Sequence, residues 1–179
     1  MELHEKFIMP RNVKSVTEAQ ELIRPLIDIA ITNDKLGMVA TLSSRTIKKL
    51  GSEKATRKSV SPALHAKAVA NIDFLYKNAE FDVVHQDYKN NRRVRQIHRL
   101  GALMFDEKNG EYIPVAITVK EFYDKGGNRI YSIEALDVNK KLNSAGHTTG
   151  LTSGPQNEGG IVPITEFNAK MQKLLDDFK

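Results

Sequence analysis

The stretch "VRQIHRLGALMFDEKNGEYIPVAITVKEFYDKGGNRIYSIEALDV", residues 94–138, decides the fold of this chain. Apolar and polar residues alternate with a period of two over 94–105, 111–123 and 128–138, which is the pattern of β-strands. Between these segments, "DEKNG" and "DKGGN" carry the Asn-Gly and Gly-Gly pairs that favour tight hairpins. The stretch therefore predicts a three-stranded antiparallel meander.

The same alternation predicts which side chains the sheet presents, because successive residues of a strand point to opposite faces. In the first strand Leu103 and Phe105 suit the core, which places His98 on the other face and Arg99 away from it, unless a bulge at Gly101 shifts the register. Extending this to the other two strands predicts one exposed face that carries His98, Thr118, Lys120, Ser132 and Glu134.

The residues before the meander have mostly helical spacing. The expected elements are a helix over 15–31 that Pro25 kinks or divides, a strand over 36–43, a basic helix over 45–56, a helix from Ser61 and Pro62 to Ala79, and a strand or loop over 80–85. The fold class is therefore α+β, with N-terminal helices packed on a small antiparallel sheet, a meander of three to four strands.

Four segments follow from these patterns. We expect a loose N-terminal arm over 1–15, a single α+β domain over 16–142, a flexible linker rich in Gly, Ser and Thr over 143–160, and a C-terminal helix over 161–179.

The net charge of +5 is concentrated in two segments. Residues 45–58 hold six basic residues against one acid, and residues 85–99 hold five against one, so the remainder of the chain is mildly acidic. Clustered Lys and Arg favour a phosphate-facing surface, because they release condensed counterions from nucleic acid. The alternative is that both segments are solvated faces that aid solubility.

Several classes of function lack their residues. There is no cysteine for disulfides, thiol catalysis or thiolate metal sites, and no apolar run of 18 residues or signal peptide, so no membrane contact is expected. The motifs GxxxxGK[ST], GxGxxG after a strand, HExxH and GxSxG are absent, and the histidines are too dispersed for a zinc site. We therefore expect no metal and no cofactor.

The polar residues of the predicted sheet face fit the cleavage of RNA without metal. Such cleavage needs a base, an acid and a cation beside the phosphate. His98 can act as base or acid near neutral pH, while Lys120, Arg99 and Arg95 can supply positive charge. Glu134 would be a second base or would orient Lys120. The alternative is that Lys120 and Glu134 form an ordinary cross-strand ion pair beside a surface histidine.

Four segments, "SVSPALHAKAVANIDFLYKNAEF", "QIHRLGALMF", "PVAITVKEF" and "RIYSIEALDV", together resemble a known family. They are similar to the barnase–EndoU–colicin–RelE-like predicted nuclease domains of large polyvalent proteins in phages and conjugative elements, over residues 36–139. The resemblance implies a four-stranded antiparallel sheet after helices and a metal-independent ribonuclease activity. It matches His65, His98, Arg99 and Lys120 to positions of the family pattern. From the residues alone, His65 equally suits a hydrogen-bonded histidine at the core edge.

The leading hypothesis is a toxin or mobile-element-associated endoribonuclease-like domain that acts in the cytoplasm of a bacterium, including a recipient or host cell. Its expected partners are RNA, including tRNA, or another nucleic acid, and a cognate protein partner or inhibitor. The expected catalytic residues are His65, His98, Arg99, Lys120 and Glu134, and the expected nucleic-acid-binding residues are His85, Arg92, Arg93, Arg95, Thr118 and Ser132. The alternative is a noncatalytic nucleic-acid-binding or protein-interaction module of a polyvalent protein.

Overall fold

The computed structural model describes the backbone of residues 5–87, 89, 91–138 and 158–178, and the side chains of these residues except 158–164. The helices are α2 (Val16–Ile23), η1 (Arg24–Leu26, a 3-10 turn), α3 (Ser44–Leu50), α4 (Glu53–Lys58), α5 (Pro62–Ala70), α6 (Ile72–Lys77) and α7 (Glu158–Asp176). The strands are β1 (Ile31–Asn33), β2 (Met38–Leu42), β3 (Phe81–His85), β4 (Val94–Asp106), β5 (Glu111–Tyr123) and β6 (Arg129–Val138). The expected α+β class is confirmed.

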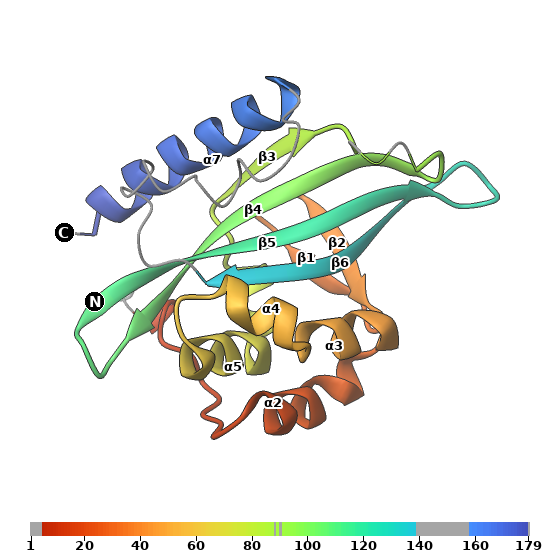
Figure 1. Ribbon diagram of the computed structural model, residues 1–179. Helices are drawn as coiled ribbons and strands as arrows, with labels where there is room; N and C mark the ends of the chain where they lie inside the picture. The colour runs from red at the N-terminus through yellow and green to blue at the C-terminus, as the bar shows by residue number, and fades with distance from the viewer. Residues whose placement is uncertain (1–4, 88, 90, 139–157, 179) are drawn as a thin grey trace.

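The strands form one curled sheet in the order β1-β2-β6-β5-β4-β3 (Figure 1). The predicted meander of β4, β5 and β6 is present, but the expectation of three to four strands is wrong, because this sheet has six. β1 has only three residues, too few to show a period, and β2 joins β6 in parallel across a long stretch of sequence. The hairpin signals that predict the meander carry no information about these distant pairings.

The helices are shorter than their sequence patterns indicate. α2 ends at Ile23 because Pro25 begins a tighter turn, and the helix expected to run to Ala79 is divided at Asn71. The Asn71 side chain accepts the backbone N–H of Arg11 at 3.0 Å and donates to the Arg11 carbonyl at 2.9 Å. Asn71 thus leaves helical geometry and holds the N-terminal segment instead.

The described part of the segment expected to be a loose arm packs against the domain. Phe7 and Met9 are buried, and the carbonyl of Phe7 accepts the backbone N–H of Phe105 at 2.7 Å. The Arg11 guanidinium pairs with Asp73 at 2.5 Å. This short segment has no sequence period, yet the buried side chains of Phe7 and Met9 enter different cores on the two sides of the sheet.

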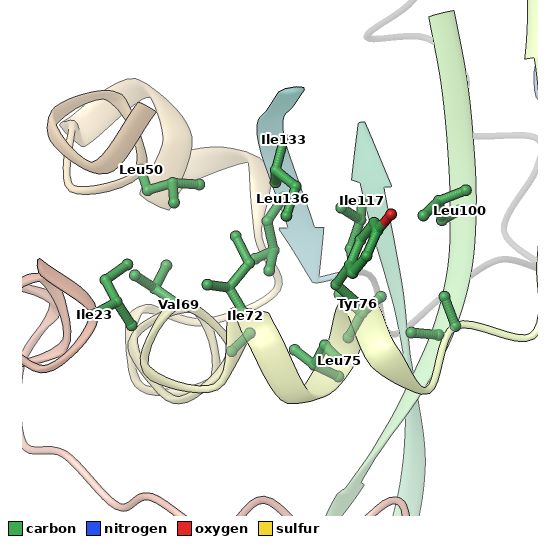
Figure 2. Close-up of a cluster of buried hydrophobic side chains, with 14 of the residues drawn as sticks. Ile23, Leu50, Val69, Ile72, Leu75, Tyr76, Leu100, Ile117, Ile133 and Leu136 are labelled. Atoms are coloured by element: carbon green, nitrogen blue, oxygen red, sulfur yellow. The ribbon is translucent and has the colours of Figure 1, made fainter. Parts of the chain in front are cut away.

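The larger core lies between the sheet and helices α2, α3, α5 and α6 (Figure 2). Apolar residues of the helices, such as Val69 and Ile72, pack against the sheet residues Leu100, Ile117 and Ile133. Burying one such side chain contributes about 1.5–3 kcal/mol. These contacts make β4, β5 and β6 a rigid support for the polar residues at their ends.

A second, smaller core lies on the opposite face of the sheet, beneath α7 (Figure 1). Phe167 and Met171 of α7 are buried there with Phe7, Val83 and Leu103. Most of the expected linker, residues 143–157, lies outside the described residues, and its last three belong to α7. Within the part of the chain that is described, no helix combines the length and the apolar character that crossing a bilayer requires.

Candidate nucleic-acid interface and a buried histidine network

His98 lies in a charged network that connects three strands. Its Nδ1 is 2.7 Å from Asp82 Oδ2 in β3, and its Nε2 is 2.9 Å from Glu121 Oε1 in β5. The second oxygen of Glu121 accepts a hydrogen bond from Arg95 Nη1 at 2.5 Å. We call Asp82, Arg95, His98 and Glu121 the His98 network. His98 is only 6% exposed and faces the larger core, so its predicted place on an exposed face is wrong.

The carboxylates determine the protonation of this network. Burial by itself would lower the pKa of His98, but the hydrogen bonds and charges of Asp82 and Glu121 outweigh it, and the pKa is raised. Burial by itself would raise the pKa of Glu121, but the hydrogen bonds from His98 and Arg95 lower it. The imidazolium of His98 and the carboxylate of Glu121 therefore stabilise each other's charged forms.

This arrangement leaves His98 without a free ring nitrogen. A catalytic histidine must offer one nitrogen to the reacting hydroxyl, and here both are held by carboxylates. The ring of Tyr131 meets the imidazole edge to face at 5.5 Å. Asp82 Oδ1 is buried and has no hydrogen-bond partner among the described residues. The network joins β3, β4 and β5 and would act as an acid or base only after one carboxylate moved away.

Arg99 points to the opposite face of the sheet, as strict alternation predicts. Its guanidinium lies 5.2 Å from the centre of the Phe167 ring, beneath α7, and its Nε is buried without a hydrogen-bond partner in the described chain. Burial lowers the pKa of Arg99, and the charge of Asp137 partly opposes this. Gly101 forms no bulge. The Phe81 ring packs directly on Gly101, and a Cβ atom on residue 101 would lie 2.2 Å from that ring.

The remaining polar residues of the predicted face are divided between the two faces. Thr118 pairs with Arg99, and Lys120 pairs with Ser132, on the outer side that α7 partly covers. A register shift after Thr118 separates Glu134 from them, and its Oε2 lies 3.8 Å from Lys49 Nζ of α3. The ion pair between Lys120 and Glu134, given above as the alternative to a catalytic role, is therefore not formed.

His65 is fully buried in the helical layer, far from the outer face of the sheet. Its Nε2 lies 2.8 Å from the Leu50 carbonyl, to which it must donate, and its Nδ1 lies 2.8 Å from the Ser59 hydroxyl. Ser59 Oγ also accepts the backbone N–H of Val138 at 3.1 Å. His65 thus fixes the end of α3, the residue after α4 and the end of β6.

The two basic segments meet at one place, which we call the lysine hollow. It has a volume of about 220 Å³, and Lys49, Lys54 and Lys58 of the first segment line it together with Lys89 of the second. Glu134 and Asp137 also line it, so four positive charges face two negative ones. β2 pairs with β6 only at residues 131–133, and the hollow lies along the part of β6 beyond this pairing.

The other predicted binding residues lie at the ends of strands. Arg92 and Arg93 are exposed just before β4, and His85 at the end of β3 has its Nδ1 2.9 Å from the Gln86 carbonyl. Arg95 is held by Glu121 and lies 5.4 Å from the Tyr123 ring. Among the described side chains, no group of three or more His, Cys, Asp or Glu could hold a metal ion.

Asp82, Glu121 and Lys89 were not predicted as site residues. Glu121 lies on the same face of β5 as the buried Ile117 and Val119. A carboxylate at an alternating position where apolar residues are expected is a sequence signal that could have identified it as a site residue. Asp82 and Lys89 carry no comparable signal, because their partners are distant in the sequence.

The comparisons with known proteins identify a family. The model of the family named large polyvalent protein-associated domain 3 matches residues 12–131, which include helices α2 to α6 and most of the sheet. Neither a curated protein nor a solved structure matches the chain. The match confirms the expected polyvalent-protein context and carries no nuclease assignment. The chain belongs to the large polyvalent protein-associated domain 3 family.

Proposed function

We propose that this domain binds nucleic acid through its basic residues and holds the strand without cleaving it. The observation that supports this function is the lysine hollow, where lysines from two separate basic segments line one depression. A solubility role requires no such convergence, since dispersed charges serve it equally well. RNA, including tRNA, in a bacterial cytoplasm is the partner we propose.

The unpaired cations of the first basic segment support phosphate contacts. All six basic residues of segment 45–58 are exposed. Two of these six residues form an ion pair within the described part of the chain: Lys49 pairs with Glu134, and Arg57 pairs with Glu53. The other four, Arg45, Lys48, Lys54 and Lys58, remain available for phosphates. Each phosphate contact releases counterions, so the affinity would fall steeply with salt.

The ribonuclease hypothesis has less support in the geometry. His98 is enclosed between carboxylates, His65 is buried among helices, Arg99 lies under α7, and Lys120 lies on a different face from His98. A metal-independent mechanism needs its acid, base and cation around one phosphate. Catalysis by these residues would therefore require a rearrangement of the sheet.

The test is binding and cleavage of labelled single-stranded RNA, tRNA and DNA by the full chain in the presence of EDTA. We expect binding with intact strands. The double variant Lys54→Gln and Lys58→Gln should bind more weakly than wild type, while Lys125→Gln, an exposed lysine in the turn between β5 and β6, should not. Cleavage that disappears in His98→Gln would replace this proposal with the ribonuclease, and absence of binding at low salt would refute nucleic-acid binding itself.

A further inference from the structure

A second hollow lies between α2 and α3 and shares no lining residue with the lysine hollow. Its volume is about 450 Å³. Sites for small organic ligands usually measure roughly 300–1,000 Å³, so this hollow is large enough for a nucleotide. The lysine hollow, at about 220 Å³, falls below that range and suits a phosphate group alone.

The charge of this second hollow is entirely positive. Arg24, Arg45 and Lys48 line it, and no carboxylate does. Arg24 is paired with Glu21 at 2.8 Å, but both side chains are exposed, and such pairs are weak. Arg45 and Lys48 have no ion pair among the described residues. A group with negative charge would therefore find two uncompensated cations here.

The remaining lining residues give the hollow an apolar wall and fixed polar groups. Ile27 and Ile47 supply the wall, and Ser44 supplies a hydroxyl without a hydrogen-bond partner in the described chain. Gln20 is held in place because its Nε2 donates to the Ile47 carbonyl at 2.9 Å. Its amide also packs on Gly51, where a Cβ would lie 2.0 Å from Nε2. The Gln20 Oε1 is left as an acceptor of fixed position.

We propose that this hollow binds a phosphorylated nucleoside. Arg45 and Lys48 hold the phosphate, because Arg forms paired hydrogen bonds to phosphate oxygens and Lys adds a point charge. The base lies against Ile27 and Ile47, and Gln20 Oε1 accepts a hydrogen bond from an N–H of the base. The nucleotide is either free or one unit of the bound strand, and the second source rests on the proposed function.

The test is calorimetric titration of the full chain with adenosine and uridine monophosphates, inorganic phosphate and the unphosphorylated nucleosides. At least one monophosphate should bind about tenfold or more tightly than phosphate or its nucleoside, since both ends of the ligand are recognised. Arg45→Gln should weaken this binding by about tenfold, while the matched control Lys125→Gln, an exposed lysine that lines neither hollow, should not change it. Gly51→Ala, which displaces Gln20 without altering charge, should reduce discrimination between bases.

The outcomes separate this inference from the proposed function. Equal binding of phosphate and both monophosphates, or an equal loss in Lys125→Gln, would overturn the nucleotide site. If a monophosphate binds while no RNA or DNA strand does, the site takes a free nucleotide and only the proposed function fails. If the monophosphate competes with labelled RNA and Arg45→Gln weakens RNA binding, the site holds a unit of the strand.

Discussion

His65 in the helical layer and His98 in the sheet are both buried, and each uses both ring nitrogens. They differ in the charge of their partners. His65 contacts a carbonyl and a hydroxyl, whereas His98 contacts two carboxylates. Burial and the use of both ring nitrogens are therefore shared by the two histidines, and the carboxylate partners belong to His98.

The largest expected effect comes from His98→Ala. This change leaves the buried Glu121 and the partly buried Asp82 with Arg95 as the one remaining cation of the network. Breaking a buried ion pair by removing one partner costs about 3–5 kcal/mol. Urea denaturation at pH 6 should show a loss of that order. A loss below about 1 kcal/mol, the range of exposed pairs, would show that the network is solvated.

His65→Ala should cost less, about 2–3 kcal/mol, because it leaves only neutral groups unsatisfied. The Leu50 carbonyl and Ser59 lose a partner, and these positions flank the helix that carries Lys54 and Lys58. Unlike His98→Ala, this variant should also weaken RNA binding, measured by fluorescence anisotropy under conditions where both variants remain folded. Equal RNA affinities in the two variants would contradict the prediction that His65 positions the helix that carries Lys54 and Lys58.

The pH dependence of stability distinguishes the two histidines further. The raised pKa of His98 gives a contribution that is complete below about 6.5 and is lost as the pH rises through the higher folded-state pKa. The lowered pKa of Glu121 gives a contribution that is complete above about 4.3 and is lost as the pH falls through the folded-state value. The network therefore stabilises most between these limits.

Free energies of unfolding from pH 4 to 9 check this window. The decline above pH 6.5 should be present in wild type and in His65→Ala and should be reduced in His98→Ala. If His98→Ala keeps the wild-type pH profile, another group causes the decline.

The smallest effect is expected for Arg99→Met. Arg99 is a charged side chain under α7 with an unpartnered Nε, and an apolar residue of similar volume should change stability by less than about 1 kcal/mol or increase it. This contrasts with His98, whose charge is compensated. Thermal denaturation provides the measurement, and a loss above 2 kcal/mol would mean that the contacts of Arg99 with Phe167 and Asp137 hold α7 in place.

The sequence predicts those parts of this fold that local rules determine. Ser15 and Ser61, where two helices were expected to begin, cap α2 and α5 by accepting the backbone N–H of Glu18 and Leu64, and the Asn-Gly and Gly-Gly turns close the meander. The exposure of His98 was predicted wrongly, because a polar residue in an alternating strand is normally assigned to solvent. Its two partners lie 16 and 23 residues away in the chain, and no local pattern reports them.

The same limit applies to the candidate interface. The two basic segments are evident in the sequence, but their meeting at the lysine hollow depends on the curl of the sheet and on the placement of α4 beside β6. Likewise, the hollow between α2 and α3 exists because Pro25 ends α2 early and Gly51 admits the Gln20 side chain. Such contacts between distant elements lie beyond what periodicity and capping rules can predict.

The most direct test of the lysine hollow is the salt dependence of RNA binding by wild type and the Lys54→Gln variant. For a single strand, each phosphate contact contributes about 0.7 to the slope of log K against log salt concentration. We predict that Lys54→Gln lowers the slope by about that amount, that Lys125→Gln leaves it unchanged, and that the RNA remains intact throughout. Identical slopes in all three proteins would contradict the assignment of the hollow as a phosphate-binding surface.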